Sequence, residues 1–171
     1  HTSHMLDEFE VLNRVPESST YEGPGKRDID YEDIQGGEQI GAGGFARVSV
    51  VTVDGQDLIV KEPFIDGTIE TDTFEAFADE AKTWSRLDDH PHIVNVVDWG
   101  NRFPWIVTEY MDGGSLAGRL DEEPLETTEA LWIGIRLSQA VQHAHRHGVA
   151  HLDLTPSNIL LRATDNGEWD V

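Results

Sequence analysis

A lysine at the end of an apolar run is the first residue whose type and position could do chemistry. Lys61 follows Leu58, Ile59 and Val60 in a chain of 171 residues that contains only three lysines. A lysine at a strand end commonly extends its ammonium group into solvent. The alternative is an ammonium group that binds phosphate, which needs a carboxylate to hold it in place and keep it charged.

A helix expected over residues 72–87 offers two candidate carboxylates. Its apolar residues recur at helical spacing and form one stripe: Phe74, Phe77, Ala78, Ala81 and Trp84. At this spacing Glu80 lies at the edge of the stripe, where the helix meets the sheet, whereas Glu75 points to water. The pattern therefore predicts Glu80 as the partner of Lys61.

The glycine-rich stretch GAGGFARV, residues 41–48, is a candidate phosphate cradle. Glycine lets the backbone approach a phosphate and offer its N–H groups, although an ordinary flexible turn has the same composition. The stretch is not a Walker A loop, and a β-branched strand follows it where a dinucleotide-binding fingerprint needs a helix. A loop between two antiparallel strands, folded over a nucleotide, fits better.

The stretch HLDLTPSNIL, residues 151–160, places three polar groups among apolar residues: His151, Asp153 and Asn158. A polar turn that enters a strand would explain each of them alone. His143 and His147 also have the i, i+4 spacing of some zinc sites. No glutamate follows the first histidine as H-E-x-x-H requires, so a metal site is the minor alternative.

The elements that would position these residues are strands and two helices. Strands are expected at 48–53 and 58–60 around an Asp54-Gly55 turn, and two more in HIVNVVDWG and RFPWIVTEY. MDGGS is expected to be a loop, and a second helix to run from Thr127 or Thr128 to about His147, where Gly148 stops it. The order is not a regular βαβ alternation, so the expected class is α+β.

Composition limits the partners. Thirty-three acids and twelve Lys plus Arg give a net charge of −21, which repels nucleic acid and anionic membranes, so neither is an expected partner. No apolar run reaches the roughly 18 residues of a membrane-spanning helix, and the absence of cysteine excludes disulfides and thiolate metal sites. Since the acids are spread along the chain, adaptation to concentrated salt is favoured over an acidic tail.

Six segments occur in the order seen in protein kinases: GAGGFARV, LIVK, FADEAKTWSRL, HPHIV, VTEYMDGGSL and HLDLTPSNILL. From about residue 34 onward the chain thus resembles the protein kinase family. The resemblance implies a protein-kinase-like α+β fold: a five-stranded antiparallel sheet with one regulatory helix, then the first helices and catalytic loop of a helical lobe. It implies an N-lobe at 34–110 and a hinge with a partial C-lobe at 111–171. The residues before these are expected to be a tag remnant, HTSHM at 1–5, and a loosely structured acidic extension at 6–33.

The resemblance also implies a cytoplasmic enzyme that uses ATP and Mg²⁺ to phosphorylate a protein Ser/Thr hydroxyl. Asp153 would be the catalytic base, Asn158 a Mg²⁺ ligand, and Lys61, paired with Glu80, would contact the α- and β-phosphates. His151 would hold the loop by hydrogen bonds. The implied nucleotide-binding residues are Gly41, Ala42, Gly43, Gly44, Phe45 and Ala46 over the phosphates, Val48, Ile59 and Leu160 around the adenine, Thr108 behind it, and the backbone of Glu109 and Met111 at its edge.

Four residues depart from the family pattern: Ala46 replaces the third loop glycine, Ile59 a small alanine, Leu152 an arginine, and Thr155 a lysine. The 171 residues contain no D-F-G, so the resemblance implies a fragment without the second metal ligand, inactive alone and prone to self-association through the helix near 128–146. The alternatives are a small-molecule phosphotransferase of the same superfamily and a non-catalytic, nucleotide-binding pseudokinase module.

Overall fold

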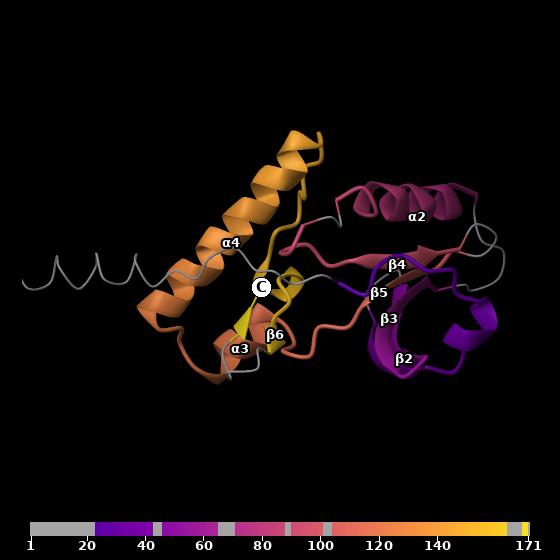
Figure 1. Ribbon diagram of the computed structural model, residues 1–171, viewed down its shortest axis with the longest axis horizontal. Helices are drawn as coiled ribbons and strands as arrows, with labels where there is room; N and C mark the ends of the chain where they lie inside the picture. The colour runs from indigo at the N-terminus through magenta and orange to yellow at the C-terminus, as the bar shows by residue number, and fades with distance from the viewer. Residues whose placement is uncertain are drawn as a thin grey trace, which may run out of the picture. The chain divides into compact units, whose positions relative to one another are not determined.

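The computed structural model describes residues 23–42, 46–64, 71–87, 90–100, 104–163 and 169–170. The chain divides into two compact units, one from Glu22 to Tyr110 and one built on Met111–Val171 (Figure 1). In the described part, no helix is long and apolar enough to cross a membrane.

The first unit is a five-stranded antiparallel sheet, as expected. Its strands are β1 Glu38–Ala42, β2 Ala46–Val53, β3 Gln56–Pro63, β4 Val96–Trp99 and β5 Ile106–Glu109, in the order β1-β2-β3-β5-β4. Helix α2, Thr71–Trp84, covers one face of this sheet, and a single 3-10 turn, η1 Tyr31–Ile34, precedes β1 (Figure 1). The expected single helix beside the sheet is present.

The hairpin of β2 and β3 has the predicted turn. Asp54 and Gly55 have φ angles of 53° and 79° between the paired residues Val53 and Gln56. Positive φ at both central residues defines the tight turn that matches the twist of the flanking strands. Both strands extend beyond the residues expected from the β-branched runs.

Two apolar clusters lie on the two faces of this sheet. The cluster beneath α2 contains Ala46, Phe77, Ala81, Val96 and Ile106. The cluster on the opposite face contains Ile29, Ile34, Val51, Leu58, Val60, Val97, Trp105 and Val107. Ile29 belongs to a segment that the sequence indicated as a loose acidic extension, yet it is buried with the sheet residues.

The second unit contains α3 Leu116–Glu122, α4 Thr127–Arg146, the 3-10 turn η2 Pro156–Asn158, and the short strands β6 Arg162–Ala163 and β7 Trp169–Asp170. Leu116, Ile133, Ile159 and Leu161 form its apolar cluster. Helix α4 has nearly the predicted bounds, with Gly148 at a φ of 74° just after it. Helix α3 was not predicted; the Ser115 hydroxyl caps it by accepting from the Gly118 amide at 3.2 Å.

Helix α4 has one buried face, and its other apolar residues are more exposed. Its buried residues are Ile133, Arg136 and Ala140, which lie on one face, while Leu131 is 44% exposed. Trp132 is partly buried, and the Arg136 guanidinium carbon lies 4.6 Å from its ring centroid. One helix face therefore packs on the described part of this unit, and the apolar residues on the other faces are wholly or partly exposed.

Candidate functional site

The Lys61 and Glu80 side chains form the predicted pair. The Lys61 ammonium on β3 lies 2.6 Å from Oε1 of Glu80 on α2, and 5.5 Å from the centroid of the Phe77 ring. The two side chains are 32% and 46% exposed, so the pair stabilises the fold by only about 0–1 kcal/mol. The pair matters more because it fixes the Lys61 ammonium group on the sheet face beneath α2.

Strand register places further predicted residues on the same sheet face as Lys61. Lys61 is paired with Val48 on β2, and Ile59 is paired with Thr108 on β5. Directly paired residues of antiparallel strands project to the same face, and residues two apart on one strand do as well. The sheet face on which Lys61 contacts Glu80 therefore also carries Val48, Ile59 and Thr108.

The glycine-rich turn lies between two antiparallel strands, as expected. Strands β1 and β2 flank it, with Gly41 paired to Val48, whereas Gly43, Gly44, Phe45 and the Ala42 side chain lie outside the described residues. Among the described residues, a Cβ atom added to Gly41 would meet only the Val48 Cβ, at 3.9 Å. The packing of the strand pair therefore does not itself require glycine at this position.

The Glu109 side chain is buried and fixes the end of β5. Its Oε1 accepts hydrogen bonds from the Asn95 backbone amide at 2.7 Å and the Asn95 carboxamide at 3.1 Å, and the Glu109 amide donates to the Asn95 carbonyl at 3.1 Å. The hydroxyl of Thr108 donates to the Glu109 carbonyl at 3.2 Å. Sequence reasoning missed Asn95, whose one signal is a single polar residue in an apolar run.

In the second unit, Asp153 and Asn158 lie side by side. The Asn158 carboxamide donates to the Asp153 carbonyl at 2.9 Å and to its Oδ2 at 3.0 Å. Pro156 begins the one-turn helix η2, and the Asn158 amide donates to the Thr155 carbonyl at 2.9 Å. A tight loop therefore presents an exposed carboxylate and an exposed carboxamide together.

The buried segment after Asn158 anchors that loop. Ile159 and Leu161 are 7% and 1% exposed, and the amide of Leu116 donates to the Ile159 carbonyl at 2.8 Å. Leu160, between them, projects to the other side and is partly exposed, opposite Ser115. Two further backbone hydrogen bonds, from the Gly113 amide to the Leu161 carbonyl and from the Leu161 amide to the Gly114 carbonyl, join the residues after the buried Met111 to the end of the loop.

His151 differs from expectation, and Leu152 beside it has an unusual backbone conformation. His151 is exposed, and within the described residues its side chain makes no hydrogen bond, so it does not hold the loop there as predicted. Leu152 is 94% exposed and has a φ of 61°, an uncommon conformation for a leucine. The contacts that close the loop come from Asn158.

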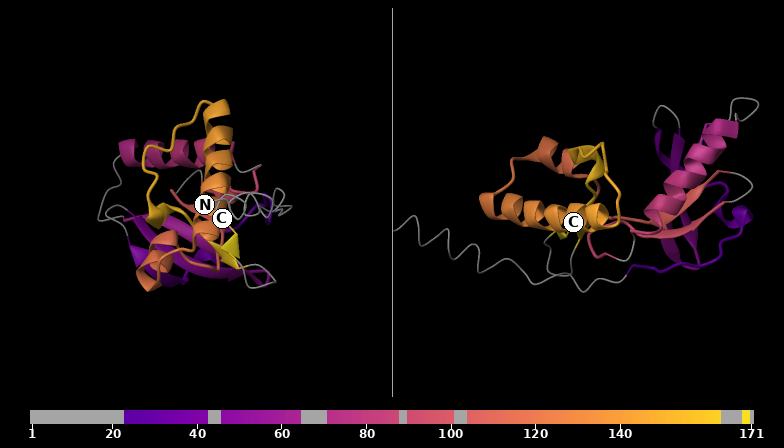
Figure 2. Two further views of the ribbon diagram at one scale, coloured as in Figure 1. Left: turned by 90° about the vertical axis from the view of Figure 1, so that its left-hand side faces the viewer. Right: turned by 90° about the horizontal axis from the view of Figure 1, so that it is seen from above.

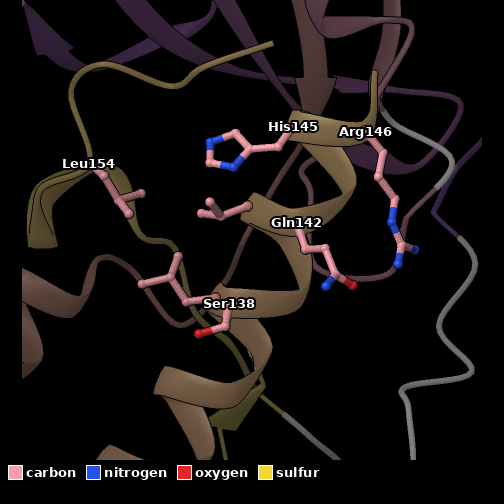
Figure 3. A pocket seen from close by; sticks show the side chains of 7 residues that line it. Ser138, Gln142, His145, Arg146 and Leu154 are labelled. Atoms are coloured by element: carbon pink, nitrogen blue, oxygen red, sulfur yellow. The ribbon is translucent and has the colours of Figure 1, made fainter. Parts of the chain in front are cut away.

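A separate hollow lies along α4. Leu137, Val141 and Leu154 form apolar walls, with Ser138, Gln142, His145 and Arg146 around them (Figure 3). None of the predicted site residues lines it. The His143 and His147 rings are tilted by 40° to each other with centroids 4.4 Å apart, but the described residues include no group of three His, Asp or Glu side chains suited to hold a metal ion.

On the sheet face opposite Lys61, Glu62 binds two groups. One oxygen of Glu62 accepts from Arg47 at 2.8 Å and the other from the Tyr31 hydroxyl at 3.1 Å. Burial, and then the Glu62 carboxylate, raise the pKa of Tyr31 above its ordinary value of 10.0. The hydrogen bond to Glu62 and its charge raise the pKa of Arg47, which stays charged.

The sheet with its paired helix, followed by the helices and the Asp153–Asn158 loop, defines a protein-kinase-like fold. The protein kinase domain family matches residues 34–168, and the chain belongs to this family.

Curated relatives of the chain are protein kinases of bacteria and animals. The chain is 38% identical over 135 residues to the serine/threonine-protein kinase PknK of Mycobacterium tuberculosis. The matched region covers 77% of this chain and 12% of PknK. It is 34% identical over 128 residues to PrkC of Bacillus subtilis (71% of this chain, 19% of PrkC). It is 29% identical over 150 residues to the kinase mos of Xenopus laevis (80% and 40%). The chain thus spans well under half the length of each of these relatives.

Proposed function

We propose that this chain binds ATP with Mg²⁺, and that the protein to which it belongs transfers the γ-phosphate to a Ser or Thr hydroxyl of a protein. The observation that carries the proposal is the 2.6 Å pair of Lys61 and Glu80 on one sheet face with Val48, Ile59 and Thr108. The similar proteins PknK, PrkC and mos are serine/threonine-protein kinases by name, which supports the acceptor class.

Lys61 would bind the α- and β-phosphates, with Glu80 holding the ammonium charged and in place. Residues 41–46 would cover the phosphates, because glycine lets the backbone approach a phosphate closely. Val48 and Leu160 would contact the two sides of the adenine, with Thr108 behind it. The backbone of Glu109 and Met111 would bind its edge.

Ile59 would make the adenine site tighter than in relatives with alanine at that position. Its side chain is partly buried on the Lys61 face, beside Thr108. A branched side chain there removes space for substituents on the base. We infer a preference for unsubstituted adenine nucleotides.

Asp153 would accept the proton of the acceptor hydroxyl, because its exposed carboxylate is oriented by Asn158. Asn158 also fits a Mg²⁺ ligand. Its carboxamide nitrogen makes both bonds to Asp153, which leaves its oxygen, the atom type that Mg²⁺ prefers, for a cation. The metal, when bound, would neutralise charge on the phosphate oxygens.

Two other functions are compatible with the same fold. Lys61 pairs with Glu80 as expected, and Asn158 binds Asp153, which favours catalysis over a non-catalytic nucleotide-binding module. The glycine-rich turn and HPHIV favour a protein acceptor over a small-molecule acceptor. Since the family's second metal ligand lies in a D-F-G motif that these 171 residues do not contain, we expect this polypeptide by itself to bind ATP without transferring phosphate.

The test is transfer of labelled phosphate from ATP to a serine-containing protein such as casein, by a polypeptide that carries these residues together with a D-F-G segment. Asp153→Asn keeps an acceptor for the Asn158 carboxamide but removes the base, so kcat should fall by roughly 100-fold or more while the affinity for ATP changes little. Asp121→Asn, an exposed acid on α3, is the matched control. An unchanged kcat in Asp153→Asn would overturn the assignment.

A further inference from the structure

The segment from Gly23 to Tyr31, here called the strap, packs against the first unit. The Arg27 amide donates to the Val97 carbonyl of β4 at 3.2 Å, and the Ile29 amide donates to Oδ2 of Asp98 at 2.9 Å. The Ile29 side chain is 6% exposed within the sheet cluster. The strap is the indigo segment that leads to η1 (Figure 2).

One side chain of the strap reaches helix α2. The Lys26 ammonium donates to the Ser85 carbonyl at 2.8 Å, a contact between residues 59 positions apart. Ser85 follows the last residue of α2, and its own amide donates to the Ala81 carbonyl at 2.8 Å. The carbonyls at a helix C-terminus lack partners within the helix and carry a partial negative charge, so a cation there stabilises the helix end.

All three lysines of this acidic chain contact α2 or the residue that follows it. Lys61 binds Glu80, Lys26 binds the Ser85 carbonyl, and Lys82 lies 3.5 Å from Asp79 within the helix itself. Lys82 and Asp79 are 61% and 78% exposed, as in an ordinary surface pair. The other two lysines come from outside α2 and contact the chain five residues apart, about 7.5 Å along a helix.

The strap and α2 meet on the same edge strand of the sheet. Helix α2 rests on β4 through Phe77 and Ala81, which pack with Val96, and the Trp84 indole donates to the Val94 carbonyl at 2.9 Å. The strap binds the same strand through the backbone of Val97 and the side chain of Asp98. Lys26 therefore joins the end of α2 to a segment that is itself fixed to β4.

We propose that the strap holds α2 where Glu80 reaches Lys61, with Lys26 as the positioning residue. The link from this contact to ATP rests on the proposed function above. The Glu80 side chain is 46% exposed and contacts Lys61 through Oε1 at 2.6 Å, so a small rotation or shift of α2 would separate the two groups. Fixing the helix end beyond Glu80 limits that movement.

The test compares Lys26→Met, which keeps the apolar stem but loses the cation, with Lys82→Met, which removes the same charge from α2 itself. The rate of amide hydrogen exchange at residues 81–85 measures how firmly the end of α2 is held. Titration with MgATP measures the affinity of the candidate site for the nucleotide. Lys26→Met should speed exchange at residues 81–85 by about tenfold and weaken ATP binding severalfold, while the amides of Leu58 and Val60 keep their protection. Lys82→Met removes an exposed last-turn cation that pairs with Asp79, so it should speed this exchange much less than Lys26→Met does and should leave ATP binding unchanged. Lys26→Arg should keep most of the slow exchange.

A double variant tests whether Lys26 affects ATP binding through Glu80. Because Lys26 acts through Glu80, adding Lys26→Met to Glu80→Gln should not weaken ATP binding further. The proposal for the strap would be overturned if residues 81–85 of Lys26→Met exchanged at the wild-type rate. It would also be overturned if Lys26→Met weakened ATP binding in Glu80→Gln as much as it does in the wild type. Faster exchange, with ATP binding unchanged in both Lys26→Met and Glu80→Gln, would support the strap and overturn the nucleotide assignment instead.

Discussion

Two neighbouring residues of β3, Lys61 and Glu62, project to opposite sheet faces because strand side chains alternate. Lys61 binds Glu80 on the face beneath α2. Glu62 binds Arg47 and Tyr31 on the other face, where the chain enters the sheet. One strand therefore forms both the candidate phosphate-binding group and the anchor of the segment that precedes the sheet.

The Tyr31 hydroxyl should make stability fall in alkali. Its pKa is raised in the folded state, so its contribution is complete below about pH 10 and is lost as pH rises through the higher folded value. Tyr31→Phe removes the hydrogen bond to Glu62 and should cost about 1–2 kcal/mol at pH 8.

The measurement for Tyr31 is urea unfolding from pH 8 to pH 11. The free-energy gap between wild type and Tyr31→Phe should narrow above pH 10, since the wild type alone loses this contribution. A gap that stays constant or widens across this range would contradict the account.

At the scale of elements, the Asn95 carboxamide adds to the backbone hydrogen bonds that join the start of β4 to the end of β5. Asn95→Ala removes a bond to the Glu109 carboxylate, which is 4% exposed, and should lower the free energy of unfolding by about 1–3 kcal/mol. Gln142→Ala, an exposed amide on α4, should change it by less than about 0.5 kcal/mol. Urea midpoints give both values, and equal losses would show that Asn95 has no special role.

The elements that the sequence predicted well are those with a local signal. The stripe from Phe74 to Trp84 predicted α2 and placed Glu80 at its edge, and Asp54-Gly55 predicted the hairpin turn. Helix α3 has seven residues and starts directly after a glycine-rich loop, so periodicity could not show it.

The residues that were missed depend on contacts between distant parts of the chain. Ile29 lies in an acidic stretch, and its burial follows from hydrogen bonds to β4 nearly seventy positions away, which no local pattern shows. The role of Asn95 is clear only from its hydrogen bonds to Glu109, fourteen positions away. His151 was expected to hold the loop by analogy with the family, and no such bond is present in the described part.

At the scale of the whole molecule, the net charge of −21 should make the fold depend on salt. Repulsion among the acids is screened over about 10 Å at 0.1 M salt and about 3 Å at 1 M. The melting temperature should rise by several degrees from 0.1 to 2 M KCl. A flat or falling melting temperature would count against adaptation to concentrated salt.

The exposed leucines of the second unit should promote self-association at high salt. Leu131 on α4 and Leu154 in the Asp153–Asn158 loop are 44% and 46% exposed, and Leu154 also lines the hollow along α4 (Figure 3). Light scattering in 2 M KCl at tens of micromolar should show dimers or larger species, reduced in Leu131→Asn. A clean monomer would contradict this expectation.

The central claim is that Lys61, held by Glu80, binds the phosphates of ATP. Its most direct test is calorimetric titration of this chain with MgATP in four forms: wild type, Lys61→Ala, Glu80→Gln and the double variant, with Lys82→Ala as the control for lost charge. Lys61→Ala should weaken binding roughly 10- to 100-fold, as expected for losing hydrogen bonds to a charged group. The double variant should bind no more weakly than Lys61→Ala, because Glu80 acts through the lysine. An affinity for MgATP that is the same in Lys61→Ala as in the wild type would contradict the account.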